Sequence, residues 1–224
     1  MGYSRSSGGI GRRLLLNAAA FAGAGVLVPA WARAQPQPDR AAVAELIKDW
    51  PKEAKAAVEE MLAKYGPPQE ATPTQLHWQA NRPWARSVVH KSGVEHDFPA
   101  KHLDVLEQAV PYRVPLNFFE ALATFNGSIV PDRTRGELVA RCDREASNIL
   151  ALNLAHDIIR GQRSVSQARD AMAAGVREIQ AGRMPDDARE LRLGPPQGDL
   201  RDPDTAAITS APGQGPAVAP ATIR

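Results

Sequence analysis

The chain has 224 residues, a formal net charge of +2, 43% hydrophobic residues and a single cysteine, Cys142. One thiol excludes an internal disulfide, so stability must come from a packed core, and the length suffices for one domain with such a core. The small net charge argues against a strongly basic, nucleic-acid-binding class of protein.

Residues 1–34 have the composition of a cleavable signal peptide. They contain four arginines and no acidic residue, and their apolar stretch, Leu14–Val28, has about the length of a signal-peptide core. The small residues of Ala32-Arg33-Ala34 predict cleavage after Ala34, which leaves Gln35 as the new N-terminus. An uncleaved membrane anchor is the alternative, but the stretch falls short of the about 20 apolar residues that span a bilayer.

The pair Arg12-Arg13 directly precedes three leucines and resembles the twin-arginine export signal, which carries folded cargo; general secretion is the alternative route. We therefore expect a periplasmic or secreted protein. Without the four signal arginines, 23 basic residues stand against 25 acidic ones, so the mature chain carries about −2. This balance predicts no nucleic-acid partner and no membrane span after cleavage, and leaves a periplasmic protein as the candidate partner.

The first part of the mature chain predicts two helices and a small sheet. Asp39 can cap an amphipathic helix that runs to Trp50, and Pro51 suits the first turn of a second helix, which ends before Gly66. The following segment is richer in aromatic and β-branched residues. It predicts strands at residues 75–79 and 85–90 and a short third strand at 94–98.

The second half of the chain predicts four helices. Apolar residues recur at helical spacing from Leu103 to Val110 and indicate the first of them. The others are expected at residues 115–125, at about 134–160 and at about 164–180, the last capped by Ser164.

This pattern predicts one α+β domain over residues 35–193. The domain is expected to be predominantly α-helical, with a small antiparallel sheet near residues 74–98 packed on a helical bundle. Residues 194–224 are rich in Pro, Gly and Ala and are expected to form a disordered tail, because they lack the apolar side chains that would offset the entropy of ordering.

Six potential metal ligands fall within a short segment of the chain: His90, Glu95, His96, Asp97, His102 and Asp104. The candidate metal ligands among them are His90, His96, His102 and Asp104. On the expected elements at most three could converge, because strand neighbours point to opposite sides and positions 102 and 104 diverge on a helix. No established zinc spacing is present. The alternative is a set of polar strand ends, with Asp97 or Lys101 capping a helix.

The expected long helix carries polar groups in an otherwise apolar run: Glu145, Asn148, Asn153, His156 and Asp157. Glu145 and His156 are the candidate catalytic residues, because a carboxylate and an imidazole can serve as acid and base. They lie three helical turns apart, roughly 16 Å by helical rise, which is too far for direct cooperation. The alternative is a set of buried polar groups that satisfy one another and fix the register of the helix.

Residues 132–137 predict the start of that long helix, with Asp132 or Thr134 as its cap. The two arginines of this segment could instead hold an anion at the helix N-terminus. Cys142 falls on the apolar side of the expected helix, which favours a small buried side chain over a nucleophile.

Parts of the mature chain resemble a group of exported bacterial proteins that carry no assigned activity. The likeness rests on Met61–Pro67, Trp78, His96–Pro99 and Cys142–Glu145. The likeness covers most of the mature domain. The opening part, a helix closed by Tyr-Gly-Pro and followed by a strand ending in Trp, is also similar to small outer-membrane assembly lipoproteins. This chain has no lipid-attachment cysteine after its signal, so the second likeness implies no role.

No established catalytic motif is present in the sequence. The sequence therefore favours an exported, non-enzymatic binding or accessory module, and it predicts no cofactor. The alternative is a small metal-assisted hydrolase that uses the ligands between His90 and Asp104. A scaffold whose tail recruits a partner is a third hypothesis.

Overall fold

The computed structural model describes residues 37–196 and 198–208, so the predicted signal peptide and residues 209–224 of the predicted tail lie outside the described residues. The two predicted helices at the start are confirmed. Asp39 accepts a hydrogen bond from the backbone of Ala42 and caps α1 (Arg40–Leu46), which is shorter than predicted because a turn follows it. α2 (Lys52–Tyr65) begins after Pro51 and ends at Gly66.

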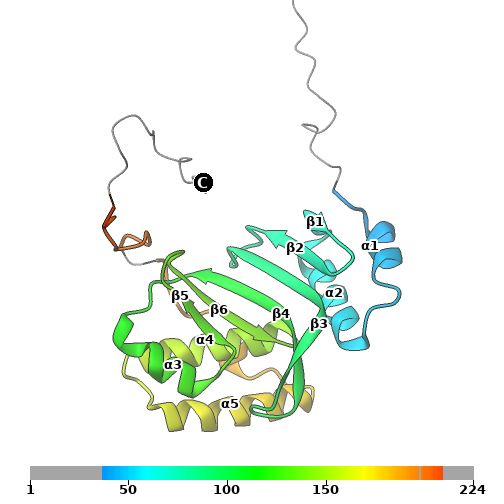
Figure 1. Ribbon diagram of the computed structural model, residues 1–224. Helices are drawn as coiled ribbons and strands as arrows, with labels where there is room; N and C mark the ends of the chain where they lie inside the picture. The colour runs from blue at the N-terminus through cyan, green and yellow to red at the C-terminus, as the bar shows by residue number, and fades with distance from the viewer. Residues whose placement is uncertain (1–36, 197, 209–224) are drawn as a thin grey trace, which may run out of the picture. The chain divides into compact units, whose positions relative to one another are not determined.

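A six-stranded antiparallel sheet lies at the centre of the described chain, with the strand order β1-β2-β3-β4-β6-β5 (Figure 1). The predicted strand at 75–79 is confirmed, and the two segments predicted at 85–90 and 94–98 are parts of one long strand. The strands are β1 (Glu70–Ala71), β2 (Gln75–Gln79), β3 (Arg86–His96), β4 (His102–Pro111), β5 (Ile129–Asp132) and β6 (Glu137–Cys142).

The helix predicted from Leu103 to Val110 is wrong, because these residues form most of β4. Most of this strand is buried on both faces. A strand covered on both sides has apolar residues at odd and even positions, and that run imitates helical spacing. The helix predicted at 134–160 is also wrong in its first part, which forms β6; only its second part is helical, as α4 (Glu145–Ile159).

The helices predicted at residues 115–125 and at about 164–180 are confirmed as helices. A short 3-10 turn, η2 (Leu116–Phe118), leads into α3 (Phe119–Phe125). Ser164 caps α5 (Val165–Gln180) in a reciprocal capping box with Gln167. A second 3-10 turn, η3 (Asp186–Ala188), follows α5 and contacts α4.

The helices α2 and α4 cover the same face of the sheet. Cross-strand partners Leu76, Val89, Leu106 and Cys142 form one row across that face. α2 packs on β3 and β4, whereas α4 packs on β6, β4 and β5, and α5 packs on α4 and α3 (Figure 1). Two apolar clusters result, one beneath α1 and α2 and one among α3, α4 and α5.

The described chain is therefore α+β, as expected, but not predominantly α-helical. The expected small sheet limited to residues 74–98 is also wrong, because four strands of the sheet, β1, β4, β5 and β6, lie outside that segment. Among the described residues, none of the helices combines the length and the hydropathy needed to cross a bilayer.

The pairing of β3 with β4 shifts register between Val89 and Val94. Gly93 lies in this irregular segment, where β4 approaches closely. A Cβ atom at position 93 would lie 2.7 Å from Cγ1 of Val105 and 2.9 Å from Cβ of Leu103. The close approach requires glycine and fixes how the last residues of β3 sit on β4.

Replacing Gly93 by Ala should lower the free energy of unfolding by about 1–3 kcal/mol, because the added methyl group forces the two strands apart. Urea denaturation followed by tryptophan fluorescence measures this change. Gly127→Ala is the control, since a Cβ there meets nothing within 4 Å, and its effect should stay within about 0.5 kcal/mol. Equal losses in both variants would contradict the close approach at Gly93.

Candidate functional site

Three of the predicted metal ligands meet at one end of the sheet, where β3 turns into β4. His96 is the last residue of β3, and His102 and Asp104 lie at the start of β4. One donor atom from each side chain lies within 4.8 Å of the others, and no other such group of three is found among the described residues. We call these three residues the histidine–aspartate cluster.

Strand geometry brings the cluster together. His102 and Asp104 are two residues apart on β4 and so project from the same face of the sheet. His96 is paired directly with His102 across the hairpin, which places it on that face as well. The expected divergence of His102 and Asp104 rested on a helix at this position and is therefore wrong.

The other predicted ligands lie elsewhere. His90 pairs with Gln75 across β2 and β3, and its Nδ1 is 3.2 Å from Gln75 Nε2. Its neighbour Val89 belongs to the helix-covered row, so His90 lies on the opposite face of the sheet from the cluster. Glu95 and Asp97 are exposed, and Glu95 forms a surface ion pair with Lys101 at 3.5 Å.

Asp104 is the buried member of the cluster, with 6% of its surface exposed. Its Oδ2 accepts a hydrogen bond from the Ser128 hydroxyl and lies 3.5 Å from His96 Nδ1. Its Oδ1 lies 3.1 Å from His102 Nε2, yet this oxygen is buried and accepts no hydrogen bond. A buried carboxylate is costly without a positive partner, so the site favours a cation at this point, either the protonated ring of His102 or a metal ion.

The orientation of His102 is fixed by the backbone. Its Nδ1 is 2.7 Å from the carbonyl oxygen of Ala100, and because a carbonyl can only accept, Nδ1 carries a proton. Nε2 therefore faces Asp104 and Cys142, whose sulfur is 3.3 Å away. Burial by itself lowers the pKa of His102, but contacts with Asp104 and Cys142 outweigh it and raise the pKa to about 11.

Cys142 is the last residue of β6 and lies across from Leu106 on the helix-covered face. It is buried, as expected, although on a strand and not on a helix. Burial raises the pKa of its thiol, so without a nearby cation the sulfur is a weak nucleophile. Cys142 and His102 both line a cavity of about 30 Å³, which also reaches Val176 and Ile179 of α5.

Two further contacts hold the cluster in place. Ser128 Oγ lies 3.2 Å from His96 Nδ1, and the backbone of Ser128 is fixed by a hydrogen bond to the Asn126 side chain. Arg169 of α5 stacks on the ring of Phe98 at 3.8 Å and donates to the carbonyl of Phe125, which ties the β3–β4 turn to α5 and α3. The predicted ligand set included neither Ser128 nor Cys142, because they come from distant parts of the chain, the turn before β5 and the end of β6.

Burial lowers the pKa of His96. Its ring is therefore neutral at neutral pH and keeps a lone pair available for a ligand. The side chains of His96 and His102 are 16% and 15% exposed, against 4% for Asp104. The two imidazoles thus stand between solvent and the buried carboxylate.

Glu145, a candidate catalytic residue, lies in a different place. It is the first residue of α4 and is 2% exposed. Trp84 Nε1 and Gln108 Nε2 donate to Oε2 at 3.0 and 2.9 Å, and Tyr65 donates to the same oxygen at 2.9 Å. Lys64 binds Oε1. The carboxylate is thus fully occupied by protein donors, which join α2, β4 and α4 through one buried group.

His156, the other candidate catalytic residue, is near the end of α4 and contacts the Tyr112 hydroxyl through Nδ1 at 2.9 Å. Burial lowers its pKa. Its neighbours Asn153 and Asp157 contact the segment that follows α5. Asn153 forms hydrogen bonds with the backbone of Asp187, Glu190 and Arg192, and Asp157 pairs with Arg192. The structure therefore places Glu145 and His156 in two separate networks.

Residues 132–137 do not begin a helix. They form the turn of the β5–β6 hairpin, in which the Asp132 side chain accepts a hydrogen bond from the backbone of Arg135 at 3.0 Å. The predicted helix cap is therefore wrong, although Asp132 does bond the backbone three residues later, as a cap would. The anion site predicted for Arg133 and Arg135 required a helix N-terminus, and this segment is a hairpin turn.

No protein-family model matches the chain, and neither curated proteins nor solved structures yield a match. The resemblance to exported bacterial proteins therefore stays a prediction. The site must be interpreted from its own geometry.

Replacing Glu145 by Ala should lower the free energy of unfolding by about 3 kcal/mol, because the buried donors of Trp84 and Gln108 lose their acceptor. Urea denaturation measures the loss. Glu53→Ala on α2 removes a carboxylate with 34% exposure and only a distant lysine contact, so it should change stability by at most about 0.5 kcal/mol. A loss no larger than that of Glu53→Ala would contradict a structural role for Glu145.

Proposed function

We propose that this protein is an exported, non-enzymatic binding module whose ligand is a divalent transition-metal ion of the zinc class. His96, His102 and Asp104 are the ligands, and Cys142, whose sulfur lies 3.3 Å from His102 Nε2 but outside the group of donors within 4.8 Å of one another, turns toward them to become the fourth donor. The observation that carries the proposal is the meeting of His96, His102 and Asp104, whose donor atoms all lie within 4.8 Å of one another around a buried carboxylate.

Asp104 Oδ1 and His102 Nε2 lie 3.1 Å apart, and on a neutral His102 ring both atoms would present lone pairs to each other. They require a positive charge between them or on one of them. A proton on Nε2 supplies that charge in the metal-free protein. A metal ion takes the place of the proton and uses both atoms as ligands.

The spacing of the donors suits a small tetrahedral site. Zinc bonds of about 2.0–2.3 Å place neighbouring donor atoms about 3.3–3.8 Å apart. His102 Nε2 lies 3.1 Å from Asp104 Oδ1 and 3.3 Å from Cys142 Sγ, and His96 Nδ1 lies 3.5 Å from the other carboxylate oxygen, Oδ2. The donors of His96, His102 and Asp104 lie within 4.8 Å of one another, so small side-chain movements bring these three onto one ion, whereas Cys142 must turn further.

The chemistry of the donors selects the class of metal. Two imidazoles, one carboxylate and one thiol suit zinc and its transition-metal neighbours. Calcium and magnesium require several oxygen ligands, whereas the cluster offers a single carboxylate. The Ala100 carbonyl that fixes the ring of His102 is the kind of second-shell partner that histidine ligands of metals have.

The surroundings favour binding over catalysis. A metal-assisted hydrolase needs an open coordination position and room for its substrate. The cavity beside His102 and Cys142 is about 30 Å³, which holds one water molecule. The predicted signal supports the same class of function, because a twin-arginine route would let the metal be loaded before export.

Expression of the full precursor in a bacterial host, with purification of the exported form without chelators, tests this proposal. Elemental analysis should find one zinc-class ion per chain. The intact mass should be that of a chain that begins at Gln35. The His96→Ala/His102→Ala variant should lose the ion, because two of the four donors are gone.

The matched control is His77→Ala/His90→Ala, which removes two imidazoles from the opposite face of the sheet and should keep the ion. Circular dichroism shows that each variant has folded. A wild-type protein that stays metal-free after dialysis against zinc, or equal metal content in both double variants, would refute the proposal.

A further inference from the structure

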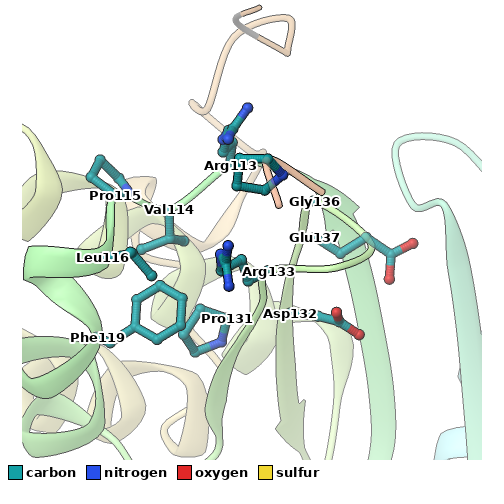
Figure 2. A pocket seen from close by; sticks show the side chains of 11 residues that line it. Arg113, Val114, Pro115, Leu116, Phe119, Pro131, Asp132, Arg133, Gly136 and Glu137 are labelled. Carbon is teal, nitrogen blue, oxygen red and sulfur yellow. The ribbon is translucent and has the colours of Figure 1, made fainter. Parts of the chain in front are cut away.

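A second site lies at the other end of β4, away from the histidine–aspartate cluster. The loop after β4 and the β5–β6 hairpin enclose a cavity of about 200 Å³. Figure 2 shows Pro115, Leu116 and Phe119 on one side of it, with Arg133 at the centre and Arg113 above. We call this cavity the arginine groove.

The chain itself covers part of the groove. Residues 198–204, which we call the strap, lie beside the β5–β6 hairpin (Figure 1) and contribute Pro203 to the lining. Arg133 forms ion pairs with Asp202, at 3.6 Å, and with Asp204. Arg113 donates to the backbone carbonyl of Asp199 at 2.6 Å.

The hairpin is shaped for this close approach. Gly136 has a φ of +64°, and a Cβ atom on it would lie 2.2 Å from the carbonyl oxygen of Leu200. Any other residue would push the strap away from the groove. The backbone of the strap is thus recognised by shape, and its carboxylates are recognised by charge.

The acidic residues of the groove do not compete for Arg133. Asp132 and Glu137 point away from it in Figure 2. Glu137 pairs with Arg86, and Asp132 lies 3.7 Å from Arg135. Among the described residues, the carboxylates that Arg133 contacts both come from the strap.

The strap leaves part of the groove unfilled. Arg133 Nε is buried and has no hydrogen-bond partner among the described residues. Leu116 remains 63% exposed at the rim. An apolar floor beside the unpaired Nε–H of Arg133 fits a longer acidic peptide better than it fits the strap alone.

We propose that the arginine groove is a binding site for an extended acidic peptide of a partner protein, with two carboxylates flanking a proline, and that the strap is its intramolecular occupant. Asp202-Pro203-Asp204 shows the chemistry that the groove accepts. A partner peptide would replace the strap, pair with Arg133 and place apolar side chains on Leu116 and Phe119. This inference does not depend on the metal site.

The test uses a fluorescent peptide with the sequence of residues 198–206, titrated into the full chain and followed by fluorescence anisotropy. The Asp202→Asn/Asp204→Asn chain should bind it at least 10-fold more tightly than the wild-type chain, because its own strap no longer competes. Adding Arg133→Gln to that chain should abolish binding. Binding should weaken as salt is raised, since it depends on ion pairs.

A peptide with asparagine at both acidic positions, and a scrambled peptide of the same composition, should not bind. Asp186→Asn, in which an exposed aspartate of η3 is changed, is the control for removal of a charge and should leave the wild-type affinity unchanged. Equal affinity of the wild-type and Asp202→Asn/Asp204→Asn chains for the peptide, or binding that survives Arg133→Gln, would overturn the proposal.

Discussion

A buried carboxylate must have a positive charge or several hydrogen-bond donors beside it, and Asp104 has too few of the latter. The Ser128 hydroxyl donates a hydrogen bond to Oδ2, whereas Oδ1 has only Nε2 of the His102 imidazole beside it, at 3.1 Å. The backbone holds that nitrogen in place through Ala100, so the ring cannot turn away without losing its own bond. The position of His102, the nearby sulfur and the proposed metal site all follow from this constraint.

Glu145 is a second buried carboxylate, and its oxygens are bound by protein donors. Glu145 is more deeply buried than Asp104, yet its oxygens are bound by Lys64, Tyr65, Trp84 and Gln108. Two of these partners come from α2 and one from β4, and Trp84 lies just before β3, so the carboxylate joins α4 to the other helix on this face and to the sheet. A carboxylate bound by several protein donors stabilises the fold, whereas Asp104, beside one hydroxyl and two imidazoles, is able to take a metal ion as a partner.

Whether a helix or strand could be predicted from the sequence depends on the spacing of its apolar residues. α2, β2 and α5 have clear start signals and one buried face, so their boundaries could be predicted. β4 could not, because it is buried on both faces and its apolar residues imitate a helix. That error hid the site, since His102 and Asp104 share a face only on a strand. The contributions of Ser128 and Cys142 depend on strand order, which local patterns do not reveal.

The visible absorption of the cobalt(II)-substituted protein tests the metal site most directly, because it reports both the number and the kind of donors. With His96, His102, Asp104 and Cys142 as ligands, one equivalent of cobalt should give the intense bands of a four-coordinate ion and a sulfur charge-transfer band. Cys142→Ser should remove the charge-transfer band. A spectrum that stays that of hydrated cobalt would contradict the account.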